Sequence, residues 1–140
     1  MKIIYRISDT GYNKIKPNYI DNKKCLANAV KTFGSENFII IADNISDDTF
    51  HMVCKYVKSK QITKVSVGHG AGTFNLALDE ALKYDDNEIV YFIENDYLHK
   101  PESQKVLEEG FNLGASFVAL YDHPDKYLDP SEGGNPYCVG

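Results

Sequence analysis

The chain has 140 residues, of which 43% are hydrophobic and 25% charged, a composition that indicates one globular domain and excludes an intrinsically disordered protein. Its formal net charge of −5 argues against bulk electrostatic binding to nucleic acid or to an anionic membrane surface. Three widely spaced cysteines favour neither a disulfide framework nor a zinc site. Because the N-terminus resembles no signal peptide and no apolar run approaches the roughly 18 residues of a membrane span, we expect a cytoplasmic protein.

Short apolar runs alternate with amphipathic windows, which predicts strands alternating with helices. The expected strands are 2–8, 37–43, 62–68, 88–94 and 116–121. Helices are expected over 22–33, from an N-cap at Ser46 to about Val57, over 73–83, and from Pro101 to about Leu113. This order predicts an α/β fold with a Rossmann-like, mostly parallel sheet of about five strands and helices on both faces.

The last part of the chain has a different character. From His123 onward it is rich in proline and glycine and shows no periodicity, which is typical of a loop. We therefore expect a domain over 1–125 and a loop or tail over 126–140, the latter as the start of an acceptor-binding part.

Acidic and glycine-rich segments follow the predicted strands, at the edge where open parallel sheets bind their ligands. These segments are Ser8–Asp9, Asp43–Asn44, Gly68–Gly72, Glu94–Asp96 and Asp122–His123. Glu94 and Asp96, one residue apart, can be directed at a single point. Two such carboxylates suit Mg²⁺ or Mn²⁺, which in turn can hold a diphosphate. A solvated acidic turn is equally compatible with this spacing.

The glycine-rich segment after the third strand carries a weak signal by itself. It follows the wrong strand for a dinucleotide fingerprint and lacks the lysine of a P-loop. Its glycines allow either a tight turn into a helix or the close approach of a ligand to the backbone.

Three blocks, taken together and in order, resemble the nucleotide-binding half of GT-A glycosyltransferases of the inverting, family-two type. IIIADNISDDT (39–49) is similar to that family's strand followed by Asp-Asp-Gly-Ser-x-Asp-x-Thr. Gly70 to Ala81, with Asn75, is similar to its Gly-x-Ser-x-Ala-x-Asn helix start. EIVYFIENDYLHKP (88–101) is similar to its strand ending in Asp-x-Asp before a proline-led helix. The likeness spans roughly residues 2–125.

The resemblance implies a metal-dependent glycosyltransferase that uses a nucleoside-diphosphate sugar, a UDP-sugar being favoured, with Mn²⁺ or Mg²⁺ as cofactor. It places these residues at the nucleotide sugar: Ser8, Asp9, Asp43, Gly70, Gly72, Asn75 and Asn95. It places the metal at Glu94 and Asp96, with Asp96 the better ligand. Glu94 and Asn44 depart from the family's acids. Asp122 and His123 are the nearest candidates for the general base, although they come earlier than that base does in the family.

Other functions stay open beside this one. A nucleotide-sugar-binding module without turnover is the main alternative, since little of the chain follows the expected metal motif. A nucleotidyltransferase would carry a glycine-rich, basic loop after its first strand, where this chain has a single glycine. A receiver-like signalling domain would need a phosphoacceptor aspartate after strand three and a lysine after strand five. The acceptor site would come from a partner, and an unpaired edge strand would favour a homodimer.

Overall fold

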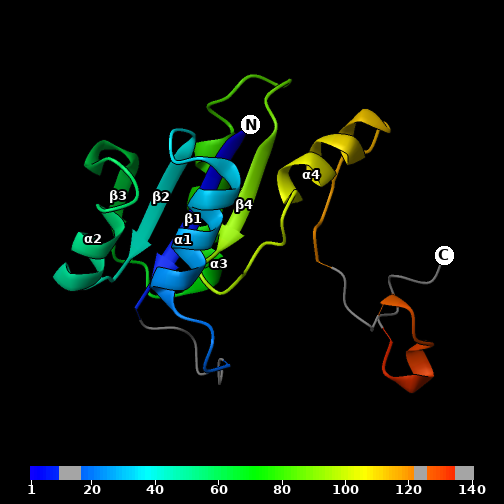
Figure 1. The fold of residues 1–140 in the computed structure, drawn as a ribbon, viewed down its shortest axis with the longest axis horizontal. Coiled ribbons are helices and arrows are strands. Elements are labelled where there is room, and N and C mark those ends of the chain that lie inside the picture. Colours follow the sequence, from blue (N-terminus) through cyan, green and yellow to red (C-terminus); the bar gives the residue numbers. More distant parts are fainter. Residues whose placement is uncertain (10–16, 122–125, 135–140) are drawn as a thin grey trace. The chain divides into compact units, whose positions relative to one another are not determined.

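The computed structural model describes residues 1–9, 17–121 and 126–134, which fall into two compact units, Met1–Pro101 and Glu102–Gly140. The first unit holds an all-parallel sheet in the order β3-β2-β1-β4 (Figure 1). Its strands are β1 (Lys2–Ser8), β2 (Phe38–Asp43), β3 (Ile62–Val65) and β4 (Val90–Glu94). The predicted α/β class and parallel sheet are therefore confirmed, with four strands in the described residues rather than about five.

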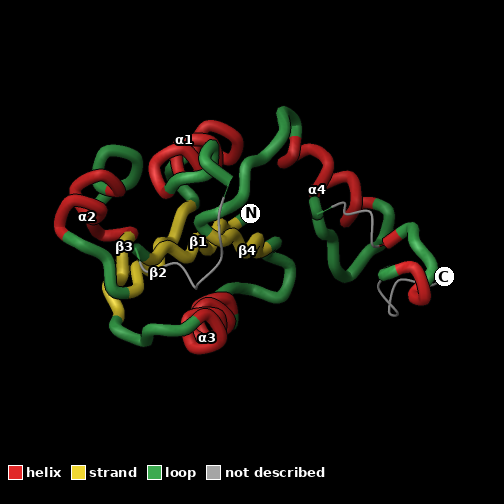
Figure 2. The backbone as a smooth tube through the Cα atoms, turned by 90° about the horizontal axis from the view of Figure 1, so that it is seen from below, coloured by secondary structure: helices red, strands yellow, loops and turns green. Residues whose placement is uncertain are grey.

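Helices cover both faces of this sheet. Figure 2 shows α1 (Asn22–Phe33) and α2 (Asp47–Val53) on one face and α3 (Gly70–Ala81) on the other. A short 3₁₀ turn, η1 (Ser59–Gln61), leads into β3. Strands β2 and β3 lie to one side of β1 and β4 lies to the other, so the strand order reverses between β1 and β4. In open α/β sheets such a reversal opens a crevice at the carboxyl ends of the two strands.

The central strand β1 supplies the core of the first unit. Its side chains alternate between the two faces, as period-two geometry requires. Ile4 packs with Ile41 of β2 and Ala77 of α3 on one face. On the opposite face Tyr5 is fully buried, with its ring centroid 6.2 Å from that of Phe38.

Polar side chains set where each helix begins. Asp21 accepts a hydrogen bond from the Lys24 N–H at 2.7 Å and caps α1. Ser46 caps α2 through the Thr49 N–H, as predicted. His69 caps α3, which explains why that helix begins at Gly70, three residues earlier than expected.

The second unit contains α4 (Ser103–Asn112) and the 3₁₀ turn η3 (Pro130–Glu132). The predicted strand over 116–121 is wrong, since these residues form no strand. Phe117 in this segment is 94% exposed. Val118 instead lies against α4, since a Cβ atom at Gly110 would come within 2.8 Å of its Cγ2. Apolar composition favours a strand only where another backbone lies alongside to complete the ladder.

Three predictions fall in or beside residues that the structure does not describe. Asp122 and His123 lie outside the described residues, and the expected domain boundary after residue 125 adjoins them and stays a prediction.

Within the described part of the chain, no helix has both the length and the apolar character needed to cross a lipid bilayer.

Candidate functional site

Two asparagine side chains join the carboxyl ends of β1 and β4, where the strand order reverses. Asn95, directly after β4, donates from Nδ2 to the Ser8 carbonyl at 3.1 Å and to Asn22 Oδ1 at 2.6 Å. Asn22, the first residue of α1, donates from its own Nδ2 to the same Ser8 carbonyl at 3.1 Å. The predicted residues Ser8 and Asn95 therefore lie together at this edge.

Asp9 links the end of β1 to the start of α2. Its carboxylate accepts hydrogen bonds from the Ser46 N–H at 2.6 Å, the Thr49 hydroxyl at 2.7 Å and Asn22 Nδ2 at 3.4 Å. Burial by itself raises the pKa of Asp9, but these hydrogen bonds to its charged form outweigh burial and hold the pKa below its ordinary value. Asp9 is thus a stable anion in the same polar cluster as Ser8 and Asn95.

Asp43 holds the turn that leads into α3. It is only 4% exposed, and its carboxylate accepts hydrogen bonds from the backbone N–H groups of Val67 at 2.6 Å and Gly68 at 2.9 Å. Asn44 Nδ2 donates to the same carboxylate at 3.1 Å. These bonds take the chain away from the β2 ladder after Val65, so β3 is shorter than the strand expected over 62–68.

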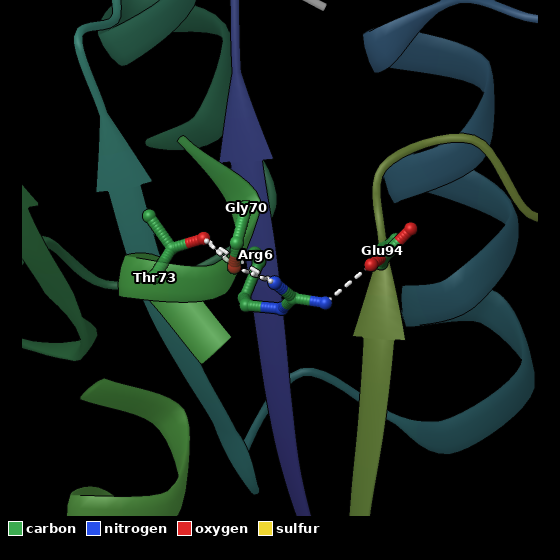
Figure 3. Close-up of polar contacts among 4 residues, drawn as sticks. All are labelled: Arg6, Gly70, Thr73 and Glu94. Carbon is green, nitrogen blue, oxygen red and sulfur yellow. Dashed lines mark hydrogen bonds and ion pairs between the residues drawn. The ribbon is translucent and has the colours of Figure 1, made fainter. Parts of the chain in front are cut away.

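A charged cluster lies on the α3 face of the sheet (Figure 3). Arg6 of β1 donates from Nη1 to the Gly70 carbonyl at 3.0 Å and to Thr73 Oγ1 at 3.2 Å. Its Nη2 forms an ion pair with Glu94 at the end of β4. The ring of Phe74 lies 5.1 Å from the guanidinium carbon, close enough for a cation–π contact. The Arg6 side chain is 13% exposed and that of Glu94 is 48% exposed.

The two acids of the predicted metal motif lie in different surroundings. Glu94 is paired with Arg6 on the α3 face. Asp96 is half-buried near Tyr5, whose side chain lies on the opposite face. Burial raises the pKa of the Tyr5 phenol, and electrostatic interaction with Cys25 and Asp96 adds to that rise.

These surroundings do not fit a metal site built by the protein alone. Among the described residues, no group of three histidine, cysteine, aspartate or glutamate side chains is arranged to hold a metal ion. Mg²⁺ is often bound through one or two carboxylates together with the phosphates of a substrate. A cation at Asp96 would therefore depend on bound phosphate for most of its ligands.

Gly72 and Asn75, both predicted at the nucleotide sugar, lie on α3. The Gly72 N–H donates to His69 Nδ1 at 3.0 Å. A Cβ atom at Gly72 would come within 2.3 Å of Val67 Cγ1 and 2.8 Å of His69 Cε1, so these side chains would have to move to admit it. Asn75 is exposed on the same helix.

The loop after β4 is fastened to α1 by a second asparagine and an aromatic group. Asn28 accepts from the His99 N–H at 2.6 Å and donates to the His99 carbonyl at 3.0 Å. The His99 ring lies edge-on to Phe33, 4.9 Å between centroids, and its Nε2 lies 3.0 Å from the Tyr91 hydroxyl. This packing fixes the loop that carries Asn95 and Asp96.

Burial of His99 makes stability depend on pH. Burial lowers the pKa of His99 from its ordinary value of 6.5. Around and below that pH, the unfolded chain therefore binds a proton at His99 more readily than the folded chain does. We therefore expect the free energy of unfolding to fall, through His99, as the pH drops from about 7.5 to about 5.5. Urea denaturation over this range should show a shallower pH dependence for His99→Asn. His51→Asn, on the exposed surface of α2, should leave the dependence unchanged, and equal slopes for the wild type and His99→Asn would contradict the prediction.

Reasoning from the sequence did not single out Arg6, Asn22, Thr49, Asn28 or His99. Arg6 did leave a signal, because a charged residue inside an otherwise apolar strand requires a partner when the strand is buried. The asparagine contacts left no such signal in the sequence, since asparagine is also common in exposed turns.

Comparisons with known proteins found no relative of this chain: no protein-family model, curated protein or solved structure matches it.

Proposed function

We propose that this chain is the nucleotide-sugar-binding part of a metal-dependent GT-A glycosyltransferase, with a UDP-sugar as the favoured donor. One observation carries the proposal. The residues that end β1 and β4 meet where the strand order reverses, and hydrogen bonds or an ion pair join them to the starts of α1 and α3. The segments that resemble the family contribute Asn95, Glu94 and Gly70 to these contacts.

The proposed donor site assigns a part to each group of residues. Ser8 and Asp9 would lie against the nucleoside. Asp43 would accept a hydrogen bond from the base. Each carboxylate oxygen has more than one lone-pair site, so the two backbone hydrogen bonds do not use every acceptor position. The turn at Gly70–Gly72 would lie beside the donor, where the absence of a Cβ lets the backbone come close.

Asp96 would hold Mn²⁺ or Mg²⁺ jointly with the donor's diphosphate. When bound, the cation supplies Lewis-acid stabilisation of the departing nucleoside diphosphate. Inversion at the anomeric carbon, and an acceptor site supplied by a further part of the protein or by a partner, are proposed from the family resemblance.

A thermal-shift panel tests the donor site. We expect one class of nucleotide among UDP-, GDP-, CDP- and dTDP-sugars to raise the melting temperature in the presence of Mn²⁺, because ligand binding to the native state stabilises it. Asp96→Asn should abolish the metal-dependent part of the shift. Asp86→Asn, the same change in the exposed loop before β4, should keep it.

The outcomes separate the candidate functions. Absence of a shift with every nucleotide, with metal present, would contradict the proposal. A shift accompanied by slow release of nucleoside diphosphate supports a glycosyltransferase, since such enzymes can pass the sugar to water. A shift without any release, with or without added sugar acceptors, supports the binding module without turnover.

A further inference from the structure

We propose that Arg6 is a positioning residue that couples the glycine-rich first turn of α3 to the acidic end of β4, so that a change at one is transmitted to the other. The inference rests on the proposed function only for the identity of the ligand. The coupling itself can be tested on the unliganded protein.

The geometry of the guanidinium group is the first argument. Nη1 donates hydrogen bonds to the first turn of α3, at the Gly70 carbonyl and Thr73 Oγ1, while Nη2 forms the ion pair with Glu94 (Figure 3). One rigid, planar group therefore makes fixed contacts with two elements that are separate in sequence. A lysine carries the same charge but cannot reproduce this fork.

The distribution of exposure is the second argument. Arg6 is almost enclosed, at 13% exposed, so its charge depends on Glu94 for compensation. Glu94 is 48% exposed and can be reached by a ligand at the carboxyl edge of the sheet. A ligand that draws on the Glu94 carboxylate must therefore alter the surroundings of Arg6 and, through Arg6, the start of α3.

The third argument is the sheet register, which pairs Arg6 directly with Glu94 across adjacent strands. Their side chains consequently share one face of the sheet, the face that α3 covers. Phe74, one residue beyond Thr73, stacks on the guanidinium and packs against Phe92 of β4, with ring centroids 5.7 Å apart. The cluster is thus a continuous contact between α3 and β4 through β1.

Amide hydrogen exchange on the unliganded chain tests the coupling. We expect Glu94→Gln and Arg6→Lys each to speed exchange at the amides of residues 73–75 by about fivefold, because the first turn of α3 then opens more readily. Glu80→Gln is the matched control. It removes an ion pair with Lys83 at the far end of the same helix and should leave these amides unchanged. Unchanged exchange in Glu94→Gln and Arg6→Lys would overturn the coupling.

Nucleotide binding provides the second measurement. Calorimetry measures the dissociation constant of UDP in the presence of Mn²⁺. This constant should rise about three- to tenfold for Glu94→Gln and for Thr73→Val. The double variant should bind UDP no more weakly than the single variant that binds it more weakly. Additive losses would overturn transmission to the ligand site. If the wild type binds no nucleotide, the proposed function fails, while hydrogen exchange still decides whether Arg6 couples the two segments.

Discussion

Asp43→Ala is expected to lower the free energy of unfolding by about 3 kcal/mol, a large share of the roughly 5 to 15 kcal/mol typical of a domain. The substitution removes a buried carboxylate and leaves the N–H groups of Val67 and Gly68 without their acceptor. Backbone donors left without an acceptor in this part-buried turn cost more than the hydrogen bonds themselves contribute. Urea denaturation followed by circular dichroism measures the change.

An aspartate at the start of α2 provides the control for this prediction. Asp48 is exposed in the first turn of that helix, so Asp48→Ala should cost only about 0.5 kcal/mol through the helix dipole. If the two variants lose the same small amount, Asp43 does not hold the turn before α3, and its carboxylate would be available to a ligand without structural cost.

Gly72→Ala is expected to destabilise the chain by about 2 kcal/mol, since an added methyl group this close to two side chains forces them to move. The new Cβ would lie 2.3 Å from Val67 Cγ1 and would press on the His69 ring that caps α3. Thermal and urea denaturation should show the loss in the absence of any ligand.

The position of Gly72, rather than helix propensity, is what this prediction tests. Asn75→Ala, an exposed change in the same helix, should be neutral or stabilising by about 0.5 kcal/mol. If Gly72→Ala is as stable as the wild type but binds UDP more weakly, the glycine serves the approach of a ligand and not the packing of the turn.

The apolar pattern was sufficient to predict the sheet of the first unit. The strand over 2–8 and the helix over 22–33 were predicted at their observed bounds, because alternation and the helical period are local properties of the chain. The segment 116–121 has the same apolar character and forms no strand, since strand formation depends on a neighbouring backbone that the local pattern does not contain.

The candidate site was predictable only in outline. Parallel strands bring their carboxyl ends to one edge, and this rule placed Ser8 and Asn95 together correctly. The rule does not say on which face a side chain lies, so Glu94 and Asp96 were expected to converge. Strand β4 ends at Glu94, so the strand alternation that would place Asp96 on the same face no longer applies, and Glu94 pairs with Arg6 while Asp96 lies near Tyr5.

The long separation between β1 and β4 has a consequence for how the chain is made. Arg6 and Glu94 are 88 positions apart, yet they lie on neighbouring strands. During synthesis β1 can pair with β2 early, but its other edge has no partner until β4 leaves the ribosome. That open edge is a template for pairing with other nascent chains. The carboxyl ends of β1 and β4, where the donor is proposed to bind, would therefore come together last in the first unit. Slowed synthesis before residue 90 would lengthen the time during which the unpaired side of β1 can aggregate.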